Sequence, residues 1–234
     1  MAARTNISKE SIINQLSILW GGLDENAQEM LSEHLTLHKY KKNEIIYKIG
    51  DTPQEAMCLL KGKVKVYKDG IGGKSQIIRA IKHYEFFAYR AYFAGESYRT
   101  AAMAIEACTV AAFPIGVIVK LMETNYKVSL FFIKYLCVEI GKSDDRTVNL
   151  TQKHIRGRLA EALLFLEDSY GLEEDGYTLS IYLSREDLAN LSNMTTSNAI
   201  RTLSAFANEK LIAIDGRKIK LIQKAELKKI SDEG

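Results

Sequence analysis

The stretch from Val128 to His154 contains no proline and one glycine, Gly141, so little in it interrupts a long helix. Small and apolar residues recur there at alternating four- and three-residue steps: Phe132, Leu136, Ile140, Ser143, Thr147 and Leu150. This spacing is typical of the seam of a two-stranded coiled coil. We therefore predict a dimerisation helix over residues 128–155 and a homodimer, with a helix of the chain's own core as the alternative.

The spacing of apolar residues before this stretch changes from a helical pattern to a strand-like one. Residues 7–37 favour helices, and Asp24 is placed to cap the second of them. Between residues 40 and 114 the apolar runs become short and are divided by glycines or polar turns, and "KVKVYKDG" alternates between apolar and charged residues. Many short strands with frequent turns predict a β sandwich or a jelly-roll barrel.

The residues after 155 predict a smaller domain of another kind. The helical run "RGRLAEALLFLEDSYG" precedes a predicted strand, "YTLSIYL", then two short helices and the strands "LIAID" and "KIKLI", joined by a tight turn at Gly216-Arg217. This order is that of a winged helix-turn-helix. The predicted fold class is α+β, with a jelly-roll domain at 1–127, the dimerisation helix at 128–155 and a winged helix-turn-helix domain at 156–234.

The two short helices lie within "LSREDLANLSNMTTSNAIRTLSAF", residues 183–206. Ser184 with Asp187 forms a capping-box pattern, Asn193 suits a turn that needs a positive φ, and Thr195 can cap the second helix. Hydroxyl, amide and guanidinium groups on the second helix and the hairpin can bond base edges and phosphates, although a solvated polar face has the same composition. The predicted DNA-binding residues are Thr195, Thr196, Ser197, Asn198, Arg201, Arg217 and Lys218. Further cations near this domain are Lys153, Arg156, Arg158 and Lys220.

The composition excludes several classes of protein. The net charge of +3 over 234 residues is too small to predict nucleic acid or an acidic membrane by itself. No apolar signal segment and no uncharged membrane-length run occurs, so we expect a cytoplasmic protein without a membrane partner. Cys58, Cys108 and Cys137 lack any paired spacing, and we expect buried reduced thiols rather than a disulfide or a metal site.

No motif for catalysis stands out. The sequence has no nucleophile–base pair, and the glycine run "GIGGK" at 70–74 lies in a predicted hairpin turn rather than before a helix. We therefore predict that the protein is not an enzyme and has no catalytic residue.

Four stretches, in their order and spacing, resemble the Crp/Fnr family of bacterial transcription regulators. They are "LLKGKVKVYKDG" after "IIYKIGD", "NLTQKHIRGRLAEALLFL", residues 183–206 and "LIAIDGRKIKLI". The resemblance covers nearly the whole chain. It implies a cyclic-nucleotide-binding-type barrel that senses an effector, a dimerisation helix and a winged helix that binds a palindromic DNA site, with RNA polymerase as an expected partner.

The recognition helix departs from the family pattern. Members of the family often begin this helix with an Arg-Glu pair that reads bases, whereas Thr196 and Ser197 occupy these positions here. The later arginine of the family is kept as Arg201. We therefore expect an operator that differs from the common family half-site.

The barrel departs further from the cAMP-binding members. There a Gly-Glu-Leu motif binds the ribose and an Arg-Ser pair binds the cyclic phosphate, whereas this chain has Ala88-Tyr89-Arg90 and Arg99-Thr100. The phosphate-type pair survives and the ribose carboxylate is lost, which favours another anionic small molecule over cAMP. The candidate effector-binding residues are Tyr89, Arg90, Arg99, Thr100, Ser143 and Asp144.

Modes of sensing other than an anionic ligand can also be judged from the residues. An iron–sulfur sensor of this family needs a cysteine cluster, mostly near the N-terminus, and residues 1–57 contain no cysteine, which argues against that mode. A haem sensor needs an axial ligand, and no spacing singles one out among His34, His38, His83 and His154, the cysteines or the methionines. An empty pocket, or a sensing module that acts on a protein partner without DNA, are further alternatives. The sequence therefore assigns neither a cofactor nor an effector.

Overall fold

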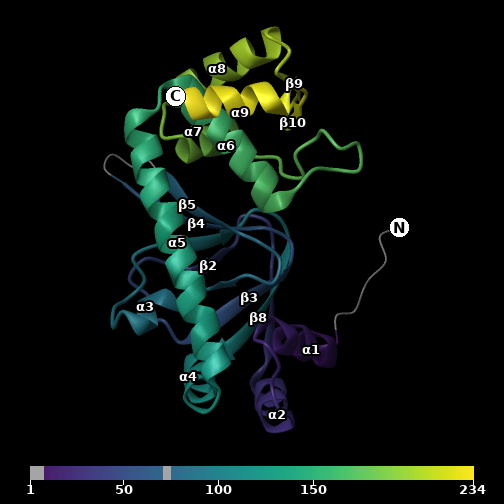
Figure 1. Ribbon diagram of the computed structural model, residues 1–234, viewed down its shortest axis with the longest axis vertical. Coiled ribbons are helices and arrows are strands. Elements are labelled where there is room, and N and C mark those ends of the chain that lie inside the picture. Colours follow the sequence, from purple (N-terminus) through teal and green to yellow (C-terminus); the bar gives the residue numbers. More distant parts are fainter. Residues whose placement is uncertain (1–7, 71–74) are drawn as a thin grey trace.

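The computed structural model of the protein describes residues 8–70 and 75–234 (Figure 1). Residues 1–7 and 71–74 lie outside the described part, and with them the first residues searched for a signal segment and most of the "GIGGK" run. The helices of the described part are α1 (Lys9–Leu19), α2 (Glu25–His34), α3 (Arg90–Phe93), α4 (Ile115–Thr124), α5 (Tyr126–Gln152), α6 (Ile155–Tyr170), α7 (Arg185–Leu191), α8 (Thr196–Asn208) and α9 (Lys224–Glu233). Its strands are β1 (Thr36–Tyr40), β2 (Ile45–Tyr47), β3 (Glu55–Lys61), β4 (Val64–Asp69), β5 (Ser75–Ile81), β6 (Phe86–Phe87), β7 (Ala101–Ala104), β8 (Cys108–Pro114), β9 (Ile212–Asp215) and β10 (Lys218–Leu221).

The strands β1 to β8 form two antiparallel sheets, with the orders β1-β8-β3-β6 and β2-β7-β4-β5. Successive side chains of β3 point to opposite faces. Met57 and Leu59 belong to the apolar cluster shared by both sheets, whereas Cys58 belongs to the cluster shared with α1, α2, α4 and α5. Because both faces of β3 are buried, "AMCLL" is continuously apolar. The two antiparallel sheets confirm the predicted jelly-roll barrel.

The N-terminal helices pack on the sheet β1-β8-β3-β6. Asp24 Oδ1 accepts the backbone N–H of Ala27 at 2.8 Å and caps α2 as predicted. The Trp20 ring, which follows α1, lies 5.4 Å from the Phe86 ring and 6.2 Å from the Phe132 ring of α5, centroid to centroid. The helical prediction ran to residue 37, but the chain already enters β1 at Thr36.

The helix α5 runs along the barrel and reaches the C-terminal domain (Figure 1). It ends at Gln152, three residues earlier than predicted, because Lys153 is extended with φ −71° and ψ 143°. His154 then serves as the N-cap residue of α6. The predicted single helix is therefore broken where the C-terminal domain begins.

The predicted dimer seam is wrong at its first position, and its second position is only half-exposed. Phe132 is 2% exposed within the chain's own core, and Leu136 packs against that core. A heptad pattern alone does not say which of several adjacent stripes the barrel covers. Of the remaining predicted positions, Ile140, Ser143 and Thr147 are exposed and Leu150 is half-buried.

A different stripe of α5 is apolar and exposed. Its large aliphatic members are Leu130 (41% exposed), Ile133 (57%), Ile140 (61%) and Val148 (48%), and the exposed Cys137 lies among them. These spacings of three, four and eight residues place the side chains along one side of the helix. We call these five residues the α5 stripe.

The helices α6 to α9 and the hairpin β9–β10 share a separate apolar core that also includes Ile77 of β5. The predicted hairpin strands form as expected. The predicted strand "YTLSIYL" does not form, because this segment makes only isolated bridges, Leu172 with Leu179 and Thr178 with Lys220. It pairs with β10 briefly and then leads into α7.

A partly buried ion pair joins the barrel to the C-terminal domain. Lys65 of β4 lies 2.5 Å from Asp187 of α7, and the two side chains are 16% and 24% exposed. Burial opposes ionisation of Asp187, but hydrogen bonds from Lys65 and Ser184 and the charge of Lys65 bring its pKa below the ordinary value. The ionised pair therefore stabilises the contact between the two domains.

Two further side chains bridge the same boundary. Arg146 of α5 donates to the carbonyl of Ile78 in β5 at 2.8 Å and to that of Leu191 in α7 at 3.3 Å. Tyr170 of α6 donates its hydroxyl to the carbonyl of Val64 at 3.1 Å. The barrel, the long helix and the C-terminal domain thus meet at a common set of polar contacts.

Replacing Lys65 by methionine should loosen α7 without disturbing the barrel. Asp187 would then be left in a partly buried site without its cation, which costs about 1–3 kcal/mol. We expect hydrogen exchange of the α7 amides to become at least about fivefold faster, as measured by mass spectrometry. Lys63→Met is the control, because Lys63 pairs with Glu106 inside the barrel at 2.9 Å. Equal exchange of α7 in both variants would contradict the role of Lys65.

Candidate nucleic-acid interface and effector cavity

The turn between α7 and α8 forms as its sequence predicts. The Ser184 hydroxyl accepts the backbone N–H of Asp187 at 3.0 Å and caps α7. Asn193 has a φ of 49°, the positive value that the turn requires. The Thr195 hydroxyl accepts the backbone N–H of Asn198 at 3.2 Å and caps α8. These local bonds fix where each helix begins.

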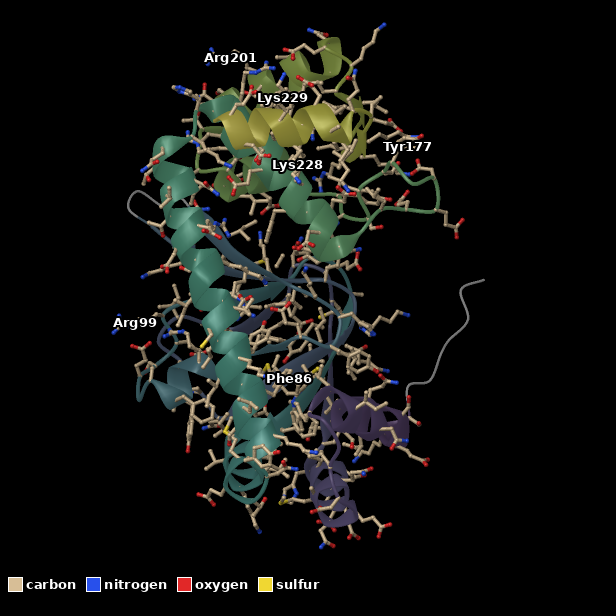
Figure 2. The ribbon with its side chains drawn as sticks, viewed as in Figure 1. Phe86, Arg99, Tyr177, Arg201, Lys228 and Lys229 are labelled. Atoms are coloured by element: carbon tan, nitrogen blue, oxygen red, sulfur yellow. The ribbon has the colours of Figure 1, made fainter. Side chains whose placement is uncertain are left out.

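The helix α8 has a buried side and an exposed side. Its buried residues are Ala199, Thr202, Leu203 and Phe206. Thr196, Ser197 and Arg201 are exposed, and Arg201 Nη2 donates to Asn198 Oδ1 at 2.8 Å. Figure 2 shows Arg201 at the end of the molecule farthest from α1 and α2. An exposed helix that presents hydroxyl groups and an oriented guanidinium fits the major groove of DNA.

The hairpin β9–β10 adds positive charge beside this helix pair. Arg217 and Lys218 are exposed at its turn. Arg185 at the start of α7 donates to the carbonyl of Gly216 at 2.7 Å and ties the turn to the helix pair. The hairpin cations are therefore held in a defined position relative to α7.

The other cations that the sequence grouped with this interface bond to groups of the chain itself. Their partners are Glu209 for Arg156, Glu161 for Lys153, Asp175 for Lys220 and the carbonyl of Leu150 for Arg158. The hydrogen bond from Arg156 is also the main reason why the pKa of Glu209 lies below its ordinary value. A cation paired with a carboxylate attracts phosphate less, so the interface prediction rests on Arg201, Arg217 and Lys218.

A cavity of about 120 Å³ opens in the barrel. Its lining residues are Tyr47, Val66, Ile78, Arg79, Phe87, Ala88, Tyr89, Arg90, Ala91, Tyr98 and Thr100. The rings of Tyr47 and Tyr98 stack with their centroids 4.0 Å apart. The buried hydroxyl of Tyr89 has no hydrogen-bond partner among the described residues, and its burial raises the pKa of Tyr89 above the ordinary value. A buried polar atom of this kind is able to bond a ligand or a water molecule.

The structure separates the predicted effector residues into two groups. Tyr89, Arg90 and Thr100 line the cavity. Ser143 and Asp144 are exposed on α5 and are not among the lining residues. They were expected to complete the pocket, and within a single chain they do not line it.

The predicted anion-binding arginines are already bridged by a carboxylate. Glu96 lies 2.9 Å from Arg90 and 2.6 Å from Arg99. The Arg99 side chain is 69% exposed and does not line the cavity, and Figure 2 shows it at the edge of the barrel near α3. An incoming anion would have to compete with Glu96 for both cations.

Arg79 of β5 lines the cavity and was missed at the sequence level. It hydrogen-bonds Glu85 and Tyr135, and its Nε lies 3.0 Å from Glu139 Oε2 on α5. Burial disfavours its charge, but these partners raise the pKa of Arg79 above the ordinary value. An arginine inside the otherwise apolar run "IIRAI" is the pattern that could have identified it. Arg79 connects the cavity wall to the long helix.

The described residues offer no support for a metal site, a membrane span or a histidine-bound haem in the cavity. In residues 8–70 and 75–234, no three His, Cys, Asp or Glu side chains gather closely enough to hold a metal ion. None of the described helices combines the length and the apolar character needed to cross a bilayer. The cavity-lining residues include no histidine. Cys58 and Cys108 are buried as expected, whereas Cys137 is exposed, because it lies on the α5 stripe.

Comparison with known proteins assigns the two parts of the chain separately. A family model described as the cyclic nucleotide-binding domain matches residues 37–125, and one described as the Crp-like helix-turn-helix domain matches residues 157–230.

Among curated proteins, the chain is 23% identical over 195 residues to the anaerobic regulatory protein of Bacillus subtilis, covering 82% of each. It is 21% identical over 187 residues to the cAMP-activated global transcriptional regulator CRP of Haemophilus influenzae, covering 80% of this chain and 84% of that protein.

Solved structures share the fold. The structure of FixK2 from Bradyrhizobium japonicum superposes with a TM-score of 0.76 at 22% identity, covering 84% of this chain and 96% of that one. The c-di-GMP responsive global regulator CLP of Xanthomonas campestris superposes with a TM-score of 0.71 at 15% identity, covering 85% and 99%. With a barrel, a long helix and a helix-turn-helix matched in order, the chain belongs to the Crp/Fnr family of DNA-binding transcription regulators, which are not enzymes.

Proposed function

We propose that the chain is a homodimeric regulator that binds a palindromic DNA site and is controlled by a small molecule in its barrel. The observation that carries this proposal is the exposed face of α8, where Arg201 stands beside short hydroxyl side chains. The proposed boundaries are 1–127 for sensing, 128–155 for dimerisation and 156–234 for DNA binding. Such a regulator works in the cytoplasm and contacts RNA polymerase at the promoters it controls.

The proposed DNA contacts divide into two kinds. Arg201, oriented by Asn198, is placed to donate two hydrogen bonds to the edge of a guanine. Thr195, Thr196 and Ser197 stand at the start of the same helix, where hydroxyl groups bond phosphates or bases. Arg217 and Lys218 on the hairpin are assigned to the DNA backbone.

Replacing Arg201 by alanine should weaken specific binding. Loss of a bidentate arginine–guanine contact costs about 1–3 kcal/mol, or roughly 5–150-fold in affinity at each half-site. The loss should also relax the base preference at one position of each half-site. The measurement is a gel-shift titration, at a stated salt concentration, against a duplex selected from a random library.

The Lys218→Ala variant is the matched control on the hairpin. It should weaken binding to selected and random duplexes alike and reduce the slope of log affinity against log salt by about 1 per half-site, or about 2 for the dimer. An Arg201→Ala variant that keeps its affinity and its base preference would overturn the proposed role of Arg201. Failure of the wild-type chain to select any duplex would favour a sensing module that acts on a protein partner.

The α5 stripe is the proposed dimer contact. Its exposed aliphatic side chains run along the helix on the side that the barrel leaves uncovered. A second copy that packs its own stripe against them would remove this apolar surface from water, at about 25 cal/mol per Å². This assignment keeps Ile140 from the predicted seam and replaces Phe132 and Leu136 by Leu130 and Ile133.

Replacing Ile133 by glutamate should dissociate the dimer. Two-fold symmetry would bring two unpaired carboxylates into the apolar seam, and we expect the dimer dissociation constant to rise at least about 100-fold. Sedimentation velocity over a concentration series measures this change. Ile18→Glu is the control, because Ile18 of α1 is also exposed, at 71%, and lies off the stripe. A dimer that survives Ile133→Glu unchanged would exclude this seam.

The barrel cavity is the proposed effector site. An anion that reached Arg79 would compete with Glu85 and Glu139, and loss of the bond to Glu139 would loosen the cavity wall from α5. The same anion would compete with Glu96 for Arg90. The two relatives named for cAMP and for c-di-GMP differ from each other in effector, so neither name is transferred to this chain.

A further inference from the structure

Ile200 is an exposed aliphatic side chain on the face of α8 that is proposed to read DNA. It is 48% exposed, whereas the other large apolar residues of this helix, Leu203 and Phe206, are 1% and 0% exposed. Packing within the chain therefore does not account for an isoleucine at this position. Its β-branched side chain also has a lower helix propensity than alanine or leucine.

The neighbours of Ile200 place it inside the proposed interface. Thr196, Ile200 and Ser204 follow each other at four-residue intervals and form one exposed row along α8. Ser197 and Arg201 form a second row beside the first. Ile200 therefore stands at the centre of the groove-facing surface and directly before Arg201 in the chain.

Ile200 is the largest side chain that projects from the first row, because its two neighbours in that row are a threonine and a serine. The Ser204 hydroxyl donates back to the carbonyl of Ile200 at 3.0 Å, so it bonds the helix itself. Thr196 is the first residue of the helix and lies one turn before Ile200. In a DNA interface, an apolar side chain of this kind is best matched by an apolar group on a base.

Among the four bases, thymine alone presents an aliphatic group in the major groove, its 5-methyl. Ile200 and Arg201 lie in adjacent rows of the same exposed surface of α8. A helix that places Arg201 on a guanine therefore brings Ile200 to a neighbouring base pair. Resting on the proposed function, we infer that Ile200 contacts the 5-methyl of a thymine next to the base pair bound by Arg201 and so sets part of the operator sequence.

The test replaces thymine by deoxyuridine, which removes only the methyl group. The wild-type chain first selects duplexes from a random library, and each thymine of the preferred half-site is then exchanged singly. One exchange, next to the Arg201-dependent position, should lower affinity about fourfold per half-site. The Ile200→Ala variant should lose a similar amount on the thymine duplex and should no longer distinguish thymine from deoxyuridine.

Two controls separate this assignment from others. Thr196→Ser removes the methyl of the other exposed methyl-bearing residue in the same row, and it should leave the thymine preference at this position intact. Ile200→Val, which keeps a branched apolar side chain, should retain most of that preference. Circular dichroism of Ile200→Ala should match the wild-type chain and its melting temperature should be no lower, because this exposed side chain is not part of the core and alanine has the higher helix propensity.

The outcomes are distinct. A half-site with no thymine beside the Arg201-dependent position overturns the inference, and so does a methyl preference that persists in Ile200→Ala or disappears in Thr196→Ser. Each of these results leaves the proposed DNA binding in place. A chain that selects no duplex overturns the proposed function and the inference with it.

Discussion

The long helix α5 has two apolar sides, and each of them has to be covered from water. On one side Val128 and Phe132 pack into the apolar core between the barrel and the helices of the same chain. On another side the α5 stripe leaves aliphatic groups in water, which is unfavourable unless another surface covers them. The remaining architecture follows from this helix, because it runs along the barrel and carries the DNA-binding domain at its far end (Figure 1).

The polar contacts of α5 relate the cavity to the DNA-binding domain. Glu139 bonds Arg79 of the cavity wall, and two turns later Arg146 bonds carbonyl groups of both β5 and α7. A shift of α5 against the barrel would change both sets of contacts together. In the proposed function, ligand binding acts by its differential affinity for two such packings, as any effector must.

Local chemistry was predictable from the sequence, and long-range pairing was not. The caps at Ser184 and Thr195 and the positive φ of Asn193 depend on neighbours within a few residues. The seam at Phe132 was misplaced because periodicity shows that a stripe exists but not what covers it. The pairing of Glu96 with Arg90 and Arg99, and of Arg156 with Glu209, joins side chains whose contact only the folded chain reveals.

The central claim is that two copies joined along α5 present their α8 helices to one DNA site. Half-sites should then be bound together only when their centres lie about one helical turn, or 34 Å, apart. The direct measurement is a gel-shift and sedimentation titration of the selected palindrome against the same palindrome with five base pairs inserted at its centre. The account predicts two chains per duplex for the first and affinity no better than random DNA for the second. Equal affinity for both duplexes would contradict it, because it would mean that the two recognition helices are not held together by α5.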